Sequence, residues 1–268
     1  MNDKKKVLGL VGSPNQEGRT SQLVGAALDR AAQAGAETEL VQMSDYVIEA
    51  CRDCLPWICA QNLKCTYDDK NFEVLSQKIL DCGGLVLGTP VYWGDTSGMV
   101  RYLFIKMMRI FARSGQLWGL PAAGIAIAGG SGNGLISGLH PVYHFFQIMR
   151  MRALEPLPAT RFDFKQALKR AGDLGYRIGG MVNERQPFDS RDECLLWYDN
   201  LPYLNESRAA KRRLLATITC EAVSDKNKLD NTISLGHADI VAAEGNSLDA
   251  LTEVSEVYDS CVKILSEQ

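Results

Sequence analysis

Four cysteines lie close together in the stretch CRDCLPWICAQNLKC, residues 51–65. They are half of the cysteines in the chain and have the spacing C-x2-C-x4-C-x5-C: Cys51, Cys54, Cys59 and Cys65. Thiolates bind metals, and four of them in one tight run are typical of an iron–sulfur cluster. The run therefore predicts a 4Fe–4S cluster held by these four side chains.

Two other interpretations of the cysteine run remain open. Zinc also takes four cysteine ligands, but structural zinc sites usually draw two ligand pairs from separated segments, and Cys54 and Cys59 are too close for that arrangement. The thiols could instead be buried small side chains or a redox-sensitive set without a metal.

The other chemically active residue types are scattered. His140 and His144 are one helical turn apart without an H-E-x-x-H pattern, so we expect them to be structural or to line a cofactor pocket. RAAKRR at 208–213 is expected to be a solvated helix face. The remaining cysteines are isolated and are expected to pack in the interior: Cys82, Cys194, Cys220 and Cys261.

The segment GSPNQEGRTSQ, residues 12–22, has the features of a phosphate-binding loop. Backbone N–H groups at the start of a helix, with the hydroxyls of Ser13, Thr20 and Ser21, can hold a phosphate, and Arg19 would add positive charge. The segment matches neither the G-x-x-x-x-G-K-[ST] loop nor the G-x-G-x-x-G fingerprint. The alternative is that these hydroxyls only cap the helix.

Two further loops suit a planar ring. GTPVYWGDTSGMVRYLFIK, residues 88–106, places Pro90, Tyr92, Trp93 and Gly94 at the end of an apolar run, where aromatic side chains can cover one face of a ring. AGGSGNG, residues 128–134, allows close approach of the backbone to the ring edge. The three loops together predict a site for a phosphorylated planar cofactor.

Alternating strand and helix patterns must position these loops. Strand-type runs and helical patterns follow one another along the first two thirds of the chain: strands at 5–13, 36–43, 83–93 and 121–134, and helices at 19–35, 68–82, 97–115, 135–154 and 163–184. This order predicts a doubly wound, three-layer α/β sandwich with a parallel sheet. Ligands of such sheets bind at the carboxyl ends of the strands, where the three loops are expected.

The pattern weakens after about residue 161. We expect residues 1–184 to form the cofactor-binding domain and residues 185–268 a mainly helical extension. An amphipathic helix is predicted from Ser247 onward. The extension could cover a sheet edge, form a subunit interface or roof a pocket.

The charge composition argues against nucleic acids and anionic membranes as partners. A formal net charge of −3, from 29 basic and 32 acidic residues, gives no field that would attract nucleic acid or an anionic membrane. The apolar run that ends before Gly12 has about six residues, shorter than a secretory or membrane-spanning segment. We therefore expect a cytoplasmic protein with reduced thiols that binds neither nucleic acid nor a membrane.

The joint order of the motifs resembles a known family. GLVGSPNQEGRTSQLV, GGLVLGTPVYWGDTSGMVRYLF and AGGSGNG are similar to the three flavin loops of the flavodoxin-like, NAD(P)H-dependent FMN reductases. The cysteine run before the second loop resembles the iron–sulfur flavoprotein branch of that family. The resemblance covers about residues 5–155 and implies a flavodoxin-like sheet of five strands.

The resemblance also implies the roles of individual residues. The FMN phosphate would be held by Ser13, Arg19, Thr20 and Ser21. The isoalloxazine would be flanked by Pro90, Val91, Tyr92, Trp93 and Gly94, and its rim formed by Gly129, Gly130 and Gly134.

Three positions depart from the family pattern. Arg19 stands where an asparagine is common, and Ile105-Lys106 stands where Asp-Arg is common, which would remove an ion pair. In the cysteine run, the gap that contains Pro56 and Trp57 has two extra residues, which would have to loop out.

The expected function is that of an FMN-dependent oxidoreductase. FMN would exchange electrons with NAD(P)H or another donor and with a cluster on the same sheet edge, and an unknown small molecule or protein would accept them. A plain FMN or quinone reductase without a cluster, a non-enzymatic electron carrier or redox sensor, and a structural zinc module remain alternatives. The resemblance further implies a homodimer or homotetramer, in which the cysteine run of one chain approaches the FMN of another.

Overall fold

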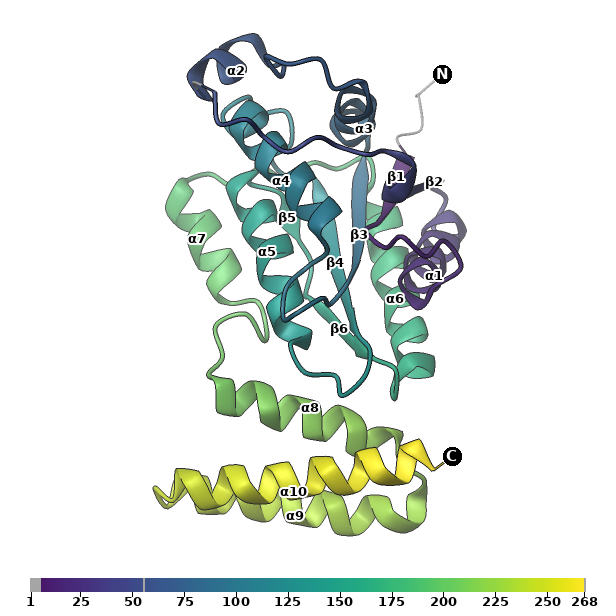
Figure 1. Cartoon of the computed structure of the whole chain (residues 1–268), viewed down its shortest axis with the longest axis vertical. Coiled ribbons are helices and arrows are strands. Elements are labelled where there is room, and N and C mark those ends of the chain that lie inside the picture. Colours follow the sequence, from purple (N-terminus) through teal and green to yellow (C-terminus); the bar gives the residue numbers. More distant parts are fainter. Residues whose placement is uncertain (1–5, 55, 268) are drawn as a thin grey trace.

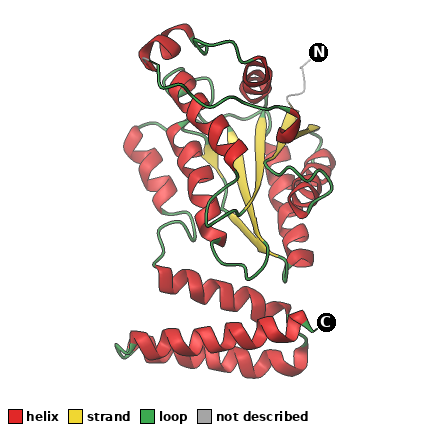
Figure 2. Ribbon diagram, in the orientation of Figure 1, coloured by secondary structure: helices red, strands yellow, loops and turns green. Residues whose placement is uncertain are grey.

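The protein is built around one parallel β-sheet, seen in a computed structural model that describes residues 6–54 and 56–267 (Figures 1 and 2). The sheet order is β2-β1-β3-β4, and β5 and β6 both pair with β4. The strands are β1 (Lys6–Val11), β2 (Glu37–Gln42), β3 (Gly84–Pro90), β4 (Pro121–Ala128), β5 (Arg152–Ala153) and β6 (Leu157–Thr160). All five pairings are parallel, which confirms the predicted doubly wound arrangement.

Helices cover both faces of the sheet. One apolar core lies between the sheet and the pair α1 (Arg19–Gln33) and α6 (Phe164–Met181). The second core joins the other face to α3 (Lys70–Asp81), α4 (Gly98–Phe111) and α5 (Leu135–Ile148). The central strands are buried on both faces, which explains why residues 84–88 form a continuous run without a charged or polar side chain.

The chain order creates a switch point between β1 and β3. From β1 the chain goes outward to β2 and then returns to the other side of β1 to form β3, so that Gly9 is paired with Leu40 on one side and Val86 on the other. The connections that leave β1 and β3 therefore diverge at their carboxyl ends. Such a divergence is where open α/β sheets bind their ligands.

The helix expected over residues 135–154 is shorter in the structure, and the fifth strand position of the sheet follows it. The helix predicted over residues 135–154 ends at Ile148, because Arg150 adopts a left-handed backbone with a φ of 49°. The Met151 N–H donates to the Phe146 carbonyl at 2.9 Å and the Arg150 N–H to the Gln147 carbonyl at 3.0 Å, the pattern of a Schellman motif. The chain then forms the short strands β5 and β6.

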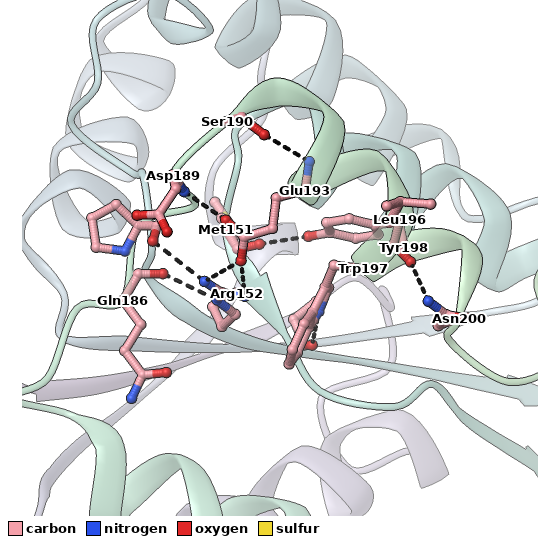
Figure 3. A network of polar contacts seen from close by, with 12 residues as sticks. Met151, Arg152, Gln186, Asp189, Ser190, Glu193, Leu196, Trp197, Tyr198 and Asn200 are labelled. Atoms are coloured by element: carbon pink, nitrogen blue, oxygen red, sulfur yellow. Dashed lines mark hydrogen bonds and ion pairs between the residues drawn. The ribbon is translucent and has the colours of Figure 1, made fainter.

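The helix α7 (Arg191–Asp199) covers the sheet edge at β5 (Figures 1 and 3). The Tyr198 hydroxyl donates to the Met151 carbonyl at 2.8 Å, and the Trp197 indole N–H donates to the Ala153 carbonyl at 2.9 Å. The Arg152 guanidinium also donates to the Glu193 carboxylate at 3.3 Å. Backbone groups at this edge are thus paired by α7 and are not open to another strand.

The last three helices form a bundle with an apolar core of its own, below the sheet in Figure 1. They are α8 (Arg208–Ala222), α9 (Asp225–Ala243) and α10 (Ser247–Ser266). The predicted amphipathic helix from Ser247 buries Val254, Val257, Tyr258 and Cys261 in this core. The helical character of the extension is confirmed, and the division at residue 184 stays a prediction.

Candidate functional site

The three predicted cofactor loops meet at the carboxyl ends of β1, β3 and β4. The Gly12 N–H donates to the Gly88 carbonyl at 2.8 Å, which joins the first loop to β3. A Cβ at Gly134 would lie 2.9 Å from the Gly94 Cα, so the third loop lies directly against the second. A Cβ at Gly12 would lie 2.3 Å from a Val100 methyl group, which explains a glycine at that position.

The first loop leaves the start of α1 open. Gly18 is the N-cap residue, no side chain in the described part of the chain caps the helix, and no acidic residue occupies its first turn. The positive end of the helix dipole and its N–H groups are therefore available for an anion. Ser13 and Thr20, both buried, flank this position.

The other two predicted phosphate ligands are turned toward protein partners. The Ser21 hydroxyl accepts a hydrogen bond from the Gln42 side chain at 2.9 Å. The Arg19 guanidinium lies 5.8 Å from the centre of the Phe164 ring, a residue of α6. Both residues lie in the first turn of α1, directly after the first loop.

The second loop ends in a tight turn with an exposed aromatic side chain. Tyr92 and Asp95 exchange backbone hydrogen bonds of 2.9 and 3.0 Å, and Trp93 and Gly94 both have positive φ, 53° and 73°. This is the backbone of a type I′ turn, which a tryptophan rarely occupies. The Trp93 side chain is fully exposed, and Tyr92 is about half exposed, 48%. A strained, exposed aromatic residue at a strand end indicates a binding surface.

Ser97 joins the candidate site, although the sequence did not reveal it. Its Oγ is buried and has no hydrogen-bond partner among the described residues. The hydroxyl lies 3.5 Å from the position of a Cβ on Gly12, which places it between the first and second loops. A buried hydroxyl without a partner costs free energy, so a polar ligand group at this point would satisfy it. The only sequence signal was its place as the N-cap of α4.

The third loop is held in a left-handed backbone. Gly130, Gly132 and Gly134 have φ values of 50°, 77° and 79°. Cβ atoms at Gly129 and Gly130 would meet no atom of the described residues within 4 Å, so these two residues face open space. The open α1 N-terminus, the orphaned Ser97 hydroxyl and this glycine rim fit a phosphorylated planar group such as FMN.

The four clustered cysteines line one small cavity. Its free volume is about 20 Å³, enough for about one water molecule. The Cys54 and Cys59 sulfurs are 3.6 Å apart, and each lies 3.5 Å from the Thr66 hydroxyl. In the described part of the chain, no group of three or more His, Cys, Asp or Glu side chains is arranged to hold a metal ion. The donor set fits a cluster in number and chemistry, and binding one would spread these side chains apart.

A short helix replaces the loop that was expected between the second and third cysteines. The helix α2 (Pro56–Asn62) includes the two-residue excess in its first turn and carries Cys59 on its buried side. Burial raises the pKa of the Cys59 thiol, but hydrogen bonds from Thr66 and Cys54 outweigh burial and lower it overall. Lys106 and Arg109 of α4 line the same cavity, together with Glu49 and Arg52.

Lys106 anchors the cysteine segment through a buried ion pair. Its ammonium group donates to the Asp69 carboxylate, and both side chains are at most 5% exposed. Asp69 also accepts hydrogen bonds from the Phe72 N–H at 3.0 Å and the Glu49 N–H at 3.1 Å. Lys106 therefore ties α4 to the end of the cysteine segment through this ion pair.

The expectation that the cysteines share a sheet edge with the flavin loops is wrong. The second loop leads into the first residue of α4, Gly98, whereas the cysteine cavity is lined by Lys106, Arg109 and Ile110 near its last residue. At a rise of 1.5 Å per residue, Gly98 and Arg109 are roughly 16 Å apart along the helix. The chain after β2 runs back across the sheet to reach α2 (Figure 1).

The two histidines lie away from the three loops. His140 Nε2 is 2.9 Å from the Lys211 ammonium nitrogen, and burial, followed by the Lys211 charge, lowers the pKa of His140. His140 and His144 border a cavity of about 150 Å³ that Tyr198 and Asn205 also line. They do not line the cofactor loops.

The isolated cysteines are all buried, as expected for packing residues. Burial raises the pKa of Cys82 and of Cys261 to about 12. Thiols with such pKa values stay protonated and unreactive near neutral pH.

RAAKRR is not a purely solvated face. Its residues Arg208, Lys211 and Arg212 line a cavity beside the third loop. This part of the sequence prediction is wrong, because the tertiary contact of α8 with that loop has no local signal. The described helices include none that is long and apolar enough to span a membrane.

Comparison with known proteins identifies relatives of the α/β part. Residues 5–162 match the NADPH-dependent FMN reductase family. An iron–sulfur flavoprotein of Methanocaldococcus jannaschii is 32% identical over 147 residues, 54% of this chain and 74% of that protein. One from Methanosarcina thermophila is 29% identical over 129 residues, 48% of this chain and 65% of that protein.

Solved structures show the same fold. A flavone reductase aligns with a TM-score of 0.54 at 18% identity, covering 68% of this chain and 66% of that one. An oxidoreductase from Corynebacterium diphtheriae aligns with a TM-score of 0.51 at 14% identity, covering 68% and 98%. The family match covers more than half of the 268 residues. The chain therefore belongs to the NADPH-dependent FMN reductase family and is an FMN-dependent oxidoreductase with a flavodoxin-like fold.

Proposed function

We propose that the protein passes electrons between NAD(P)H or another donor, FMN, a 4Fe–4S cluster and a further acceptor. The observation that carries the proposal is that all four clustered thiols line one cavity, together with two cations of α4, in a chain that also has three flavin-type loops. The names of the two archaeal relatives agree with this combination. FMN supplies the chemistry of accepting a hydride and releasing electrons singly, which suits a one-electron cluster.

The residues of the three loops would hold FMN by separate contacts. The start of α1 and the buried hydroxyls beside it would bind the phosphate, and the orphaned Ser97 hydroxyl would gain a polar partner. The turn at 92–95 would cover one face of the ring, with the glycine rim at its edge. The full proposed set is Ser13, Arg19, Thr20, Ser21, Pro90, Val91, Tyr92, Trp93, Gly94, Ser97, Gly129, Gly130 and Gly134.

The cysteine cavity is prepared for thiolate ligands. The lowered pKa of Cys59 favours deprotonated sulfur at this position. Asp53 pairs with Arg109 at 2.5 Å from outside the cavity, which holds the guanidinium in place. Cys51, Cys54, Cys59 and Cys65 would be the four ligands.

The separation of about 16 Å along α4 supports a working unit of two or more chains. In a homodimer or homotetramer, the cysteine cavity of one chain would lie close to the FMN of its partner, as the family resemblance implies. Mixing a chain that lacks the cluster with one that lacks FMN would test this. Recovery of activity in the mixed oligomer is expected, and no recovery would contradict the shared arrangement.

The composition of anaerobically purified protein tests the cluster. We expect FMN, iron and acid-labile sulfide in the wild type, with about four irons per chain. Cys59→Ser should lose the iron and keep the FMN, because the two sites lie at opposite ends of α4. Cys220→Ala, a buried thiol of the bundle, is the matched control and should retain both. Iron that persists in Cys59→Ser at the wild-type level would contradict the assigned ligand.

A plain NAD(P)H-dependent FMN or quinone reductase is the second candidate. It is favoured by the close Cys54–Cys59 contact and the small cavity, which are typical of packed thiols. Bound FMN, steady NAD(P)H oxidation and no iron in anaerobic protein would support it. Bound flavin and iron without NAD(P)H turnover would instead indicate an electron carrier or sensor.

A further inference from the structure

The helix α8 of the C-terminal bundle forms a cavity against the third flavin loop. The cavity has a volume of about 290 Å³, close to that of small-ligand sites. One wall is the loop and the start of α5, residues 132–137, and the other wall is α8. Gly134 belongs both to this wall and to the contact with Gly94 in the second loop, so the cavity adjoins the proposed flavin rim.

The bundle is fixed in this position by contacts to the loop. The Tyr258 hydroxyl of α10 donates to the Ser131 carbonyl. Arg212 donates to the Asn133 side chain at 3.3 Å. A Cβ at Gly132 would lie 2.8 Å from a Leu215 methyl group, so α8 packs directly on the loop backbone. These contacts define both walls of the cavity.

The charged side chains that line the cavity are all positive. Arg208, Lys211 and Arg212 line it, and none of the described residues that line it is acidic. Arg212 forms an ion pair with the Asp259 carboxylate at 3.7 Å, whereas Lys211 contacts His140, whose lowered pKa keeps it neutral. Among the side chains that the structure describes, none pairs with Arg208.

The placement of these cations is costly unless an anion is present. Arg208, Lys211 and Arg212 all lie in the first five residues of α8, and no acidic residue occupies its first turn. Cations at a helix N-terminus oppose the helix dipole. The first turn of α5, which faces the same cavity, also lacks an acidic residue and a side-chain cap. An anionic group would reduce the repulsion on both walls.

We infer that this cavity binds the anionic group, phosphate or carboxylate, of a substrate whose redox-active part reaches the flavin at Gly134. The inference rests on the proposed function for the flavin itself, but the cavity is made by α8, which lies beyond residues 5–162. The anion can belong to a pyridine nucleotide donor or to an electron acceptor such as a carboxylated quinone. In either case Arg208 and Lys211 would select charged substrates over neutral ones.

Titration calorimetry on the protein as purified tests the cavity in two arms. The nucleotide arm compares NADP⁺ with NAD⁺, and the acceptor arm compares a carboxylated naphthoquinone with menadione, which is neutral. The variants are Arg208→Gln and Lys211→Gln, and Lys165→Gln on α6 is the charge-matched control. Arg208 and Lys165 are exposed, and glutamine at 211 can still contact His140, so all three variants should fold.

The expected result is about tenfold weaker binding of the charged probe in each cavity variant, from loss of one charge-assisted hydrogen bond. Menadione binding and the control variant should show no change, and NAD⁺, which keeps its pyrophosphate, should lose no more than NADP⁺. Loss confined to the nucleotide arm assigns the cavity to the donor, and loss confined to the carboxylated quinone assigns it to the acceptor. Equal binding of both charged probes by wild type and variants would overturn the inference. The purified protein could contain no FMN while its cavity variants still bind the charged probe more weakly than wild type. That result would refute the proposed function and still support the anion site.

Discussion

Removing the buried Lys106 ammonium should destabilise the protein strongly. Lys106→Met keeps the length and apolar stem of the side chain but leaves the Asp69 carboxylate, 3% exposed, without its counter-charge. Breaking a buried pair by removing one partner costs about 3–5 kcal/mol. Asp69 keeps its hydrogen bonds from the Phe72 and Glu49 N–H groups, so we expect about 3 kcal/mol, the lower end of that range.

The double variant separates the ion pair from simple packing. Asp69→Asn alone should also cost about 3 kcal/mol, because it leaves a buried ammonium unpaired. Lys106→Met combined with Asp69→Asn removes both charges, so the cost should be well below the sum of the two singles. Urea unfolding of the three variants and the wild type, all without cofactors, measures the free energy of unfolding. Additive effects, or a cost below about 1 kcal/mol for Lys106→Met, would refute the role of the pair.

The pH dependence of stability gives an independent check on the same pair. Burial raises the pKa of Asp69, but the Lys106 ammonium and two backbone N–H groups outweigh it, so the folded pKa lies below the ordinary value. The stabilisation is therefore present above the unfolded pKa of about 3.9 and is lost as the pH falls through the folded pKa. Wild type and Lys106→Met should differ most at neutral pH and converge in acid. A difference that stays constant down to strong acid would contradict this.

Three further changes test other parts of the structure. Trp93→Gly should stabilise the protein by about 1 kcal/mol in urea unfolding, because it removes a tryptophan from a left-handed backbone conformation. The same change should weaken FMN binding measured by fluorescence, and an unchanged FMN affinity would argue against the aromatic surface. Gly175→Ala places a Cβ 1.9 Å from the Ala27 carbonyl oxygen and should lower the free energy of unfolding by about 2 kcal/mol. Gly180→Ala in the same helix, whose Cβ would meet no described atom, should be neutral or stabilising. Equal effects of the two changes would contradict the close packing of α1 and α6. Tyr143→Phe should lower stability by about 1–3 kcal/mol, because the hydroxyl bridges two buried backbone groups, and a neutral result by thermal unfolding would contradict that role.

Local patterns in the sequence predicted most of the sheet. The apolar runs of β1, β3 and β4 and the helical spacing of α1 and α4 appear at their expected places, because strand and helix periodicity is a local property. The short strands β5 and β6 were hidden, because apolar residues recur past Ile148 at Met149, Met151 and Leu154 and resemble a continuing helix face. Only the left-handed backbone at Arg150 ends the helix, and arginine carries no signal for that conformation.

The candidate site was predictable in its loops and not in its long-range contacts. The glycines, hydroxyls and aromatic residues of the three loops stand out by type, whereas Ser97 looks like any helix cap. Lys106 and Asp69 are 37 residues apart, and their pairing depends on where α4 crosses the cysteine segment. The cavity of Arg208 and Lys211 likewise depends on how the bundle packs on the third loop. Contacts of this kind follow from tertiary structure, which a local pattern does not contain.

A reductive titration of anaerobically purified protein tests the proposed combination of FMN and cluster most directly. Dithionite is added in known portions while the absorbance of the flavin and of the iron–sulfur chromophore is followed. Two electrons for FMN and one for a 4Fe–4S cluster predict an uptake of about three electrons per chain, with bleaching of both chromophores. An uptake of about two electrons with flavin bleaching alone would contradict the cluster. Protein without a flavin chromophore would contradict the assignment of the three loops.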